Sequence, residues 1–330
     1  MEPHGRNLRS AKIGRRLFTL ASVAVALSGC GPANRSEGTG STAASTVAAP
    51  VTDAPAKPPT ATLPAALRPL PDPQAAGSSL PPETRRPPRP APSRLPAAPT
   101  RGRIVADFTG KAPGTWGLHV PGTAANLTGG GRTIALTFDC CGGPGGNGVD
   151  QELIDTLQRT GTRATFFLNF RWIQANPGVA KSLAENPLFE IGNHGTKHIP
   201  LSVCGRSAYG IQGTASAAEV YDEVMVNQAA LHRLTGKPAR YFRPGTAYLD
   251  EVSAAIVREL GLIPVSFSIN GDGGATYPAP VVFGEVAAAK PGDIIIAHAN
   301  QPGGGTAAGV AQALTALQAA GLRPGRLNLK

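Results

Sequence analysis

The chain has 330 residues and a formal net charge of +10, but that charge is unevenly distributed. Residues 1–103 hold 14 of the Lys and Arg against 5 Asp and Glu, so they carry +9 and the remainder only +1. Proteins that bind nucleic acid gather positive charge on a folded face, and the nearly neutral remainder argues against nucleic acid as a partner.

Residues 1–30 are typical of an export signal. Arg15-Arg16 precedes a short apolar run at 17–28, which ends in the sequence Leu-Ser-Gly-Cys at Cys30. A positive region, a short apolar stretch and small residues describe a secretory signal, and the run is too short to span a bilayer well. Its end resembles a bacterial lipobox, and 14–18 loosely resembles a twin-arginine signal. We therefore expect an exported lipoprotein, anchored to the cell membrane through Cys30 and facing the cell wall. Ordinary cleavage and secretion are the alternative.

Residues 31–102 are rich in Pro, Ala, Thr, Ser and Arg and contain no aromatic residue. This composition cannot bury enough apolar surface to fold, so we predict a disordered tether. As a flexible coil it would reach on the order of 45 Å. A lead-in segment at 103–131 then precedes one globular domain at 132–330. These last two parts have roughly 225 residues, enough for one substantial core.

From residue 132 onward, apolar runs of strand length alternate with helical patterns. We expect strands at 133–138, 164–168, 189–192, 241–242, 263–269, 293–297 and 327–329. We expect helices at 149–160, 177–184, 216–234, 249–260, 282–289 and 306–320. Apolar strands separated by helices imply a parallel sheet that is buried on both faces. So many units in one domain favour a distorted or incomplete β/α barrel. A Rossmann sheet is the alternative, but the glycine run at 142–146 fits its phosphate-binding motif poorly.

Each of the first six predicted strands is followed by a polar residue that is capable of chemistry. In chain order these residues are Asp139, Asn169, His194, Arg243, Asn270 with Asp272 beyond it, and His298. The carboxyl ends of barrel strands converge on one mouth, where barrel enzymes carry their active sites. Each residue alone has a structural explanation, such as a helix cap or a turn, but the combination predicts an active site.

His194 and His198 lie four residues apart in a chain with only six histidines. If the segment after Asn193 turned into a helix, the two side chains would share one helical face. Two imidazoles placed in this way can hold one divalent metal ion. A metalloprotease is a weaker interpretation, because Gly195 stands where the protease helix carries its catalytic Glu.

Taken together, these motifs resemble the NodB-type polysaccharide deacetylases, carbohydrate esterase family 4. The resemblance covers about residues 132–329, and the motifs occur in the family's order. They are Thr137-Phe138-Asp139, Asn193-His194 with His198, Phe242-Arg243-Pro244-Gly245, Asp272, and Ile296-Ala297-His298. The resemblance implies a distorted β/α barrel that removes acetyl groups from N-acetylglucosamine units with a divalent metal held by an Asp and two His.

The resemblance also implies a role for each matching residue. Asp139 would be the general base, Arg243 would orient it, His194 and His198 would bind the metal, and His298 would be the general acid with Asp272 setting its tautomer or charge. Amide hydrolysis agrees with these roles, because it needs an activated water, a stabilised oxyanion and a protonated leaving amine. A backbone N–H near Thr246 could supply a second oxyanion donor.

The match breaks at the position after Asp139, where the family usually has a second Asp that binds the metal. This chain has Cys140 there, followed by Cys141. A thiolate from either cysteine could be the third ligand, and we name Cys140 for this role; a thiolate favours Zn²⁺, with Co²⁺ or Ni²⁺ as alternatives. Asp139 could itself reach the metal. Finally, Cys141, or else Cys140, could form a disulfide with Cys204, as an exported chain permits. Spacing does not decide among these alternatives.

The sequence therefore predicts an exported, lipid-anchored and monomeric carbohydrate N-deacetylase that depends on a metal. Because the anchor and tether would hold it at the cell envelope, the expected substrate is peptidoglycan or another N-acetylglucosamine polymer. A glycan-binding lipoprotein that keeps the barrel but lacks catalysis is the alternative. Phe170, Trp172 and Tyr209 are candidates to stack on a sugar ring, with ordinary packing as the alternative for each.

Overall fold

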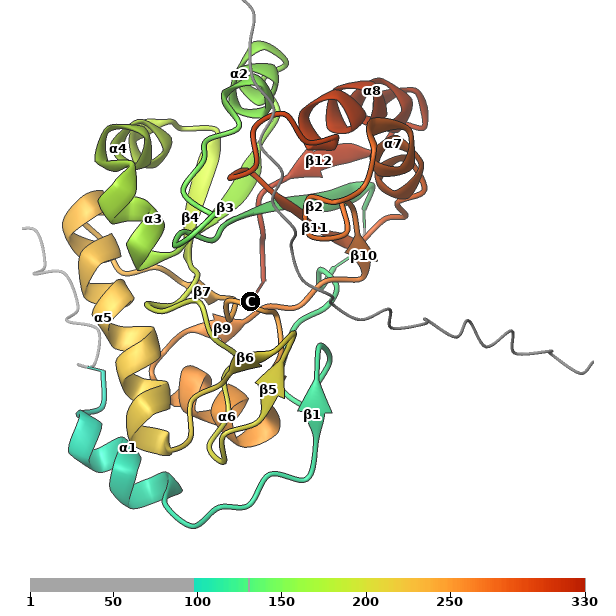
Figure 1. Cartoon of the computed structure of the whole chain (residues 1–330). Helices are drawn as coiled ribbons and strands as arrows, with labels where there is room; N and C mark the ends of the chain where they lie inside the picture. The colour runs from blue at the N-terminus through green and yellow to red at the C-terminus, as the bar shows by residue number, and fades with distance from the viewer. Residues whose placement is uncertain (1–97, 130, 330) are drawn as a thin grey trace, which may run out of the picture. The chain divides into compact units, whose positions relative to one another are not determined.

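The computed structural model describes residues 98–129 and 131–329 (Figure 1). The predicted signal with Cys30, and the tether up to residue 97, lie outside the described residues. Regular structure begins with α1 (Arg101–Phe108), where the Thr100 side chain accepts a hydrogen bond from the backbone N–H of Arg103. The helix thus starts within the last residues of the predicted tether. In this described part, no helix has both the length and the apolar character needed to cross a membrane.

A curled sheet of eight parallel strands forms the centre of the domain (Figure 1). Its strands follow the order β10-β11-β2-β3-β4-β7-β9, and β12 pairs with the start of β2. Their bounds are β2 (Thr133–Cys140), β3 (Ala164–Leu168), β4 (Phe189–Asn193), β7 (Tyr241–Phe242), β9 (Ile263–Pro264), β10 (Ile269–Asn270), β11 (Ile294–His298) and β12 (Arg323–Gly325). No pairing joins β10 to β9, so the predicted incomplete barrel is confirmed.

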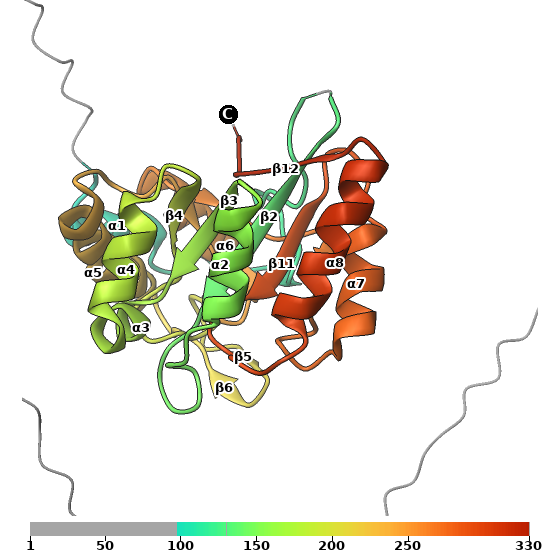
Figure 2. The ribbon, with the colours of Figure 1, turned by 90° about the horizontal axis from the view of Figure 1, so that it is seen from above.

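Helices cover the outside of this sheet (Figure 2). They are α2 (Gln151–Arg159), α3 (Phe170–Ala175), α4 (Pro177–Glu185), α5 (Ala217–Thr235), α6 (Glu251–Glu259), α7 (Ala279–Ala287) and α8 (Thr306–Ala319). The local sequence explains where they begin. Asp150 and Ser216 cap α2 and α5 by accepting backbone N–H groups, and Pro177 occupies the first turn of α4. These are the residue types that favour helix starts.

Two predicted strands differ from the structure. The run at 263–269 is divided into β9 and β10. Between them, the backbone N–H of Val265 still donates to Phe242 of β7, whereas that of Ser266 donates to Ala124 in the lead-in segment. The last strand, predicted at 327–329, lies at Arg323–Gly325. Leu327 and Leu329 are buried in the core rather than paired in the sheet, and their backbone N–H groups donate to side-chain hydroxyls.

Three smaller elements complete the fold. The strand β1 (Trp116–Gly117) pairs with β8 (Leu249–Asp250), and a hairpin joins β5 (Ser207–Ala208) to β6 (Ile211–Gln212). Residues from both the hairpin and the loop after β1 reach the carboxyl end of the sheet, where they line the pocket described below.

Candidate active site

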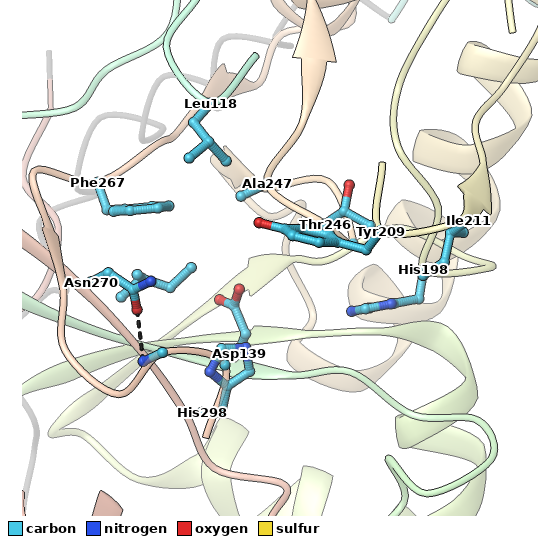
Figure 3. A pocket seen from close by; sticks show the side chains of 14 residues that line it. Leu118, Asp139, His198, Tyr209, Ile211, Thr246, Ala247, Phe267, Asn270 and His298 are labelled. Carbon is cyan, nitrogen blue, oxygen red and sulfur yellow. Dashed lines mark hydrogen bonds between the residues drawn. The ribbon is translucent and has the colours of Figure 1, made fainter. Parts of the chain in front are cut away.

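The polar residues predicted at strand ends do converge at the carboxyl edge of the sheet. Asp139 in β2 lies in register with His298 in β11, and His194 directly follows β4. The backbone N–H of Arg243, just after β7, donates to Asn193 at 2.9 Å, which ties those strand ends together. Figure 3 shows Asp139, His198 and His298 facing one pocket, whose volume is about 350 Å³.

Asp139 and Arg243 form a buried ion pair. Arg243 Nη1 donates to Asp139 Oδ1 at 2.8 Å and to Thr137 Oγ1 at 2.9 Å, and Nη2 donates to the Ser266 carbonyl at 3.0 Å. The guanidinium also lies 4.3 Å from the centre of the Phe167 ring. Burial alone would raise the pKa of Asp139, but the neighbouring positive charges, that of Arg243 above all, hold it below its ordinary value. The carboxylate is therefore ionised and fixed in one orientation.

His298 pairs with Asp272 on the other side of the pocket. His298 Nδ1 lies 2.9 Å from Asp272 Oδ1, and the backbone N–H of His298 donates to Oδ2 at 2.6 Å. Thr306 Oγ1 also donates to Oδ2, at 3.0 Å. Burial would lower the pKa of His298, but the bond to Asp272 and its charge raise that pKa well above its ordinary value. The pair thus holds a protonated imidazole in the pocket.

The segment that carries His194 and His198 is a turn and not the helix on which the spacing argument relied. His198 adopts a left-handed backbone conformation with φ of 60°, and no helix is assigned between β4 and β5. The two imidazoles nevertheless meet, with ring centres 5.0 Å apart. The predicted proximity is therefore right, while the helical reason for it is wrong.

Cys141 completes a group of three metal-binding side chains with these histidines. One ligand atom from each of Cys141, His194 and His198 lies within 4.8 Å of the others. His194 Nδ1 is 2.9 Å from the carbonyl oxygen of Arg243. Because a carbonyl can only accept, Nδ1 carries a proton, so the neutral imidazole has its free lone pair on Nε2. The buried Nε2 of His198 has no hydrogen-bond partner among the described residues. This set of one sulfur and two imidazole nitrogens fits a zinc-type ion.

The cysteine assignments made from the sequence need correction. The Cys140 side chain packs in the hydrophobic core, so it is not the third ligand; Cys141 is placed there instead. Burial raises the pKa of the Cys140 thiol well above its ordinary value. The predicted disulfide between Cys141 and Cys204 is absent, since the three cysteines of the described residues are all free. Asp139 lies outside the ligand group, although its Oδ2 is 3.6 Å from His194 Nε2.

The sequence analysis missed Glu223, which holds the histidine turn from the side of α5. Its carboxylate accepts backbone N–H groups from Thr196 at 2.9 Å, Lys197 at 2.9 Å and His198 at 3.1 Å. Glu223 is buried because it lies on the core-facing side of α5, together with Val220 and Asn227. An acidic residue at helical spacing within a core-facing stripe was the signal that could have identified it.

Glycine at 245 is a second requirement for the position of His198. A Cβ at that position would lie 2.4 Å from the backbone of His198, closer than real Cβ atoms come. The chain after Arg243 therefore approaches the histidine turn as closely as only glycine allows. The motif around Arg243 thus shapes the ligand group as well as the charge partner of Asp139.

We expect Glu223→Ala to lower zinc affinity by about 10- to 100-fold, the usual cost of removing a partner that orients a metal ligand. The measurement is competition with a chromophoric chelator. Asp222→Ala is the matched control, because the side chain of that neighbour on α5 pairs with Arg101, and only its backbone carbonyl, which the variant keeps, contacts the histidine turn. Equal zinc affinity in the Glu223→Ala variant and the wild type would refute this positioning role.

The walls of the pocket are mainly apolar. Leu118, Ala247, Phe267, Tyr209 and Ile211 line it, and Thr246 lies among them (Figure 3). Within residues 98–129 and 131–329, no hydrogen bond uses the backbone N–H of Thr246, so it is available as the predicted oxyanion donor.

Of the three aromatic candidates for sugar stacking, only Tyr209 lines this pocket. It is 74% exposed, and its ring centre lies 5.4 Å from that of Tyr248. The stacking prediction is wrong for Trp172, which is fully buried and donates its indole N–H to Gly148 at 2.8 Å. Phe170 is half-buried and does not line this pocket.

Comparisons with known proteins agree with this geometry. Residues 126–265 match the family model for polysaccharide deacetylase. The chain is 29% identical over 168 residues to the peptidoglycan-N-acetylglucosamine deacetylase PgdA of Listeria monocytogenes, a match that covers 51% of this chain and 32% of that protein. The chain therefore spans about a third of the length of such curated relatives.

Two solved structures show the same fold. A family 4 carbohydrate esterase pseudoenzyme from Bacillus anthracis matches with a TM-score of 0.53 at 20% identity, over 63% of this chain and 68% of that one. The family 4 carbohydrate esterase PdaA of Bacillus subtilis matches with a TM-score of 0.50 at 20% identity, over 68% and 86%. From these matches, residues 126–265 are similar to polysaccharide deacetylase domains, and the chain shares the fold of the family 4 carbohydrate esterases.

Proposed function

We propose that the protein is a metal-dependent N-deacetylase that removes acetyl groups from the N-acetylglucosamine units of an envelope glycan such as peptidoglycan. One observation carries this proposal. A carboxylate paired with Arg243, a protonated imidazole paired with Asp272 and the ligand group of Cys141, His194 and His198 all meet at one pocket. The resemblance to a pseudoenzyme concerns the fold, whereas these side chains form a complete set for amide hydrolysis.

In the proposed reaction, the two sides of the pocket carry out separate proton transfers. Asp139 is ionised and takes a proton from the water that attacks the acetyl carbonyl, while Arg243 keeps its carboxylate aimed at the pocket. The free backbone N–H of Thr246 donates to the oxyanion that then develops. His298 gives its proton to the departing amine nitrogen, which is released as the glucosamine amine together with acetate. Asp272 supplies the negative charge that keeps His298 protonated before this step.

The ligand group accounts for the proposed dependence on a metal. Zn²⁺ is the expected ion for one thiolate and two imidazoles, and a bound ion would polarise the carbonyl and acidify water. Burial alone would raise the pKa of Cys141, but hydrogen bonds with His194, His198 and His298 bring it well below its ordinary value. The thiolate form that binds metals is thus favoured within the protein itself.

The proposed location rests on the sequence of the N-terminal residues. The signal-like segment with its lipobox-like end supports export and an anchor at Cys30, followed by a tether long enough to reach across part of the envelope. An anchored enzyme of this kind would meet peptidoglycan as its most abundant N-acetylated polymer. We propose that it works there as a monomer. Cys30→Ala should move the protein from the membrane fraction to the soluble fraction.

Acetate release is the direct test of the proposed function. The zinc-loaded protein should release acetate from peptidoglycan or from N-acetylglucosamine oligomers, and chelation of the metal should abolish that release. If the loaded protein binds these glycans but releases no acetate from either, the non-catalytic glycan-binding alternative is correct. Metal content measured in the same samples separates an inactive site from an empty one.

A further inference from the structure

A second pocket adjoins the first at the reaction centre and differs from it in carrying two cationic side chains. Its volume is about 590 Å³, and it shares His198, His298, Ile211 and Gly274 with the first pocket. The rest of its lining is mixed. Apolar contacts come from Ile199 and Pro144, and polar ones from Cys141, the backbone of the glycine loop after it, and the amide side chains of Asn300 and Gln301. Two cationic side chains, Arg171 and Lys197, also line it. No carboxylate is among the lining residues.

Arg171 has unused hydrogen-bonding capacity in this pocket. It lies in the first turn of α3, where Asn169 Oδ1 accepts its backbone N–H at 3.0 Å. Its side chain makes one long hydrogen bond, from Nη2 to the Gly142 carbonyl at 3.4 Å, and its buried Nε has no partner among the described residues. The guanidinium is packed against Gly143, where a Cβ would come within 2.7 Å of it. A fixed cation with free donors remains beside the reaction centre.

Neither cation is neutralised by the protein. Across residues 98–129 and 131–329, no carboxylate oxygen lies within 4.0 Å of the charged nitrogens of Arg171 or Lys197. An arginine fork matches the two oxygens of a carboxylate, and a nearby lysine adds a second positive charge. A neutral sugar polymer would leave these charges without a partner.

We infer that Arg171 and Lys197 bind a carboxylate carried by the glycan substrate next to the sugar that is deacetylated. The inference rests on the proposed function and adds a substrate class to it: acidic glycans are preferred over neutral N-acetylglucosamine polymers. The reacting sugar would face the first pocket with Leu118 and Phe267, while its acidic neighbour would lie in the second pocket beside Arg171 and Lys197. The two pockets meet at His198 and His298, so one chain can occupy both.

The test compares three substrates. N-acetylglucosamine oligomers carry no carboxylate. Peptidoglycan strands stripped of their peptides expose the lactyl carboxylate on the sugar, whereas in intact strands that group is amidated and the free carboxylates lie on the peptide. We expect a higher kcat/KM on one or both peptidoglycan substrates than on the oligomers, and the preferred one identifies the source of the carboxylate. The same kcat/KM on all three would overturn the inference.

Variants then assign the effect to the two cations. The double variant Arg171→Gln, Lys197→Gln should lose about 10- to 100-fold in kcat/KM on the acidic substrate, mainly through KM, as expected for one charge-assisted contact. It should keep its rate on the neutral oligomers. Arg171→Lys should retain part of the preference. Lys181→Gln is the control, because it removes an exposed cation on α4 that lines neither pocket.

Failure of this inference is distinguishable from failure of the proposed function. An equal loss on neutral and acidic substrates would indicate a structural role for Arg171 and would overturn the inference while deacetylation stands. If no substrate releases acetate, the deacetylase proposal fails. The affinity of the protein for the stripped strands, measured by calorimetry, then still tests whether Arg171 and Lys197 bind their carboxylates. Binding that is weakened in the double variant but not in Lys181→Gln supports the inference, and unchanged binding refutes it.

Discussion

Asp139→Asn should lower the rate of acetate release by about 10²- to 10⁴-fold, the usual contribution of a positioned general base. The substitution keeps the shape of the side chain, and the amide oxygen can still accept the hydrogen bond that Arg243 Nη1 now makes at 2.8 Å. What the variant lacks is an oxygen that can take a proton from water. The expected result is therefore a loss in kcat with little change in structure, measured as acetate released per mole of zinc-loaded protein.

Two controls make this result specific. Metal content should be unchanged, because Asp139 lies outside the group formed by Cys141 and the two histidines. The melting temperature should also be recorded, since the variant removes one charge from a buried ion pair. If Asp139→Asn retains wild-type activity with full metal content, Asp139 is not the base, and the assignment of proton transfers fails.

Cys141→Ser should lower zinc affinity by about 100-fold or more, since loss of a ligand should exceed the 10- to 100-fold cost of losing a partner that orients one. A neutral hydroxyl is a poor substitute for a thiolate at neutral pH. Cobalt substitution gives a readout that does not depend on activity. The wild type should show a near-ultraviolet charge-transfer band from thiolate to Co²⁺, and the Cys141→Ser protein should lack it.

Cys140→Ser is the matched control for this experiment. The Cys140 side chain packs in the core, so the variant should keep the cobalt band and the zinc affinity. It should instead lower the free energy of unfolding by about 1–3 kcal/mol, because the new hydroxyl would be buried without a partner. A band that persists in Cys141→Ser and disappears in Cys140→Ser would show that the two cysteines have been assigned the wrong way round.

The alternation of strands and helices was predictable because β2, β3 and β11 are buried runs of apolar residues, which produce a strong local signal. The divided strand at β9 and β10 was not predictable. Its residues are mainly apolar, and the stretch between the two strands pairs with Ala124, more than 130 residues earlier in the chain. Local patterns carry no information about such distant partners.

The choice between the two cysteines shows the same limit in the site. Every residue of β2 after Thr133 is buried, so no alternation of polar and apolar residues reveals which face each side chain occupies. The signal that could have decided it is spacing from Asp139. Residues two apart in a strand point to the same side, which places Cys141 with Asp139 and Cys140 with the core. Glu223 could not be found by family motifs, because it acts only through the backbone of the histidine turn.

The hairpin of β5 and β6 has a consequence for how this protein could diversify. Tyr209 and Ile211, on this short loop, form part of the rim of the pocket, whereas Asp139, Arg243 and His298 are held by the strands of the central sheet. The groups proposed to break the amide bond and this part of the proposed sugar-binding rim thus belong to separate pieces of the chain. Under the proposed function, exchanging hairpin residues 207–212 would change the polymer that is accepted without rebuilding the chemistry, as loops on a rigid scaffold commonly allow.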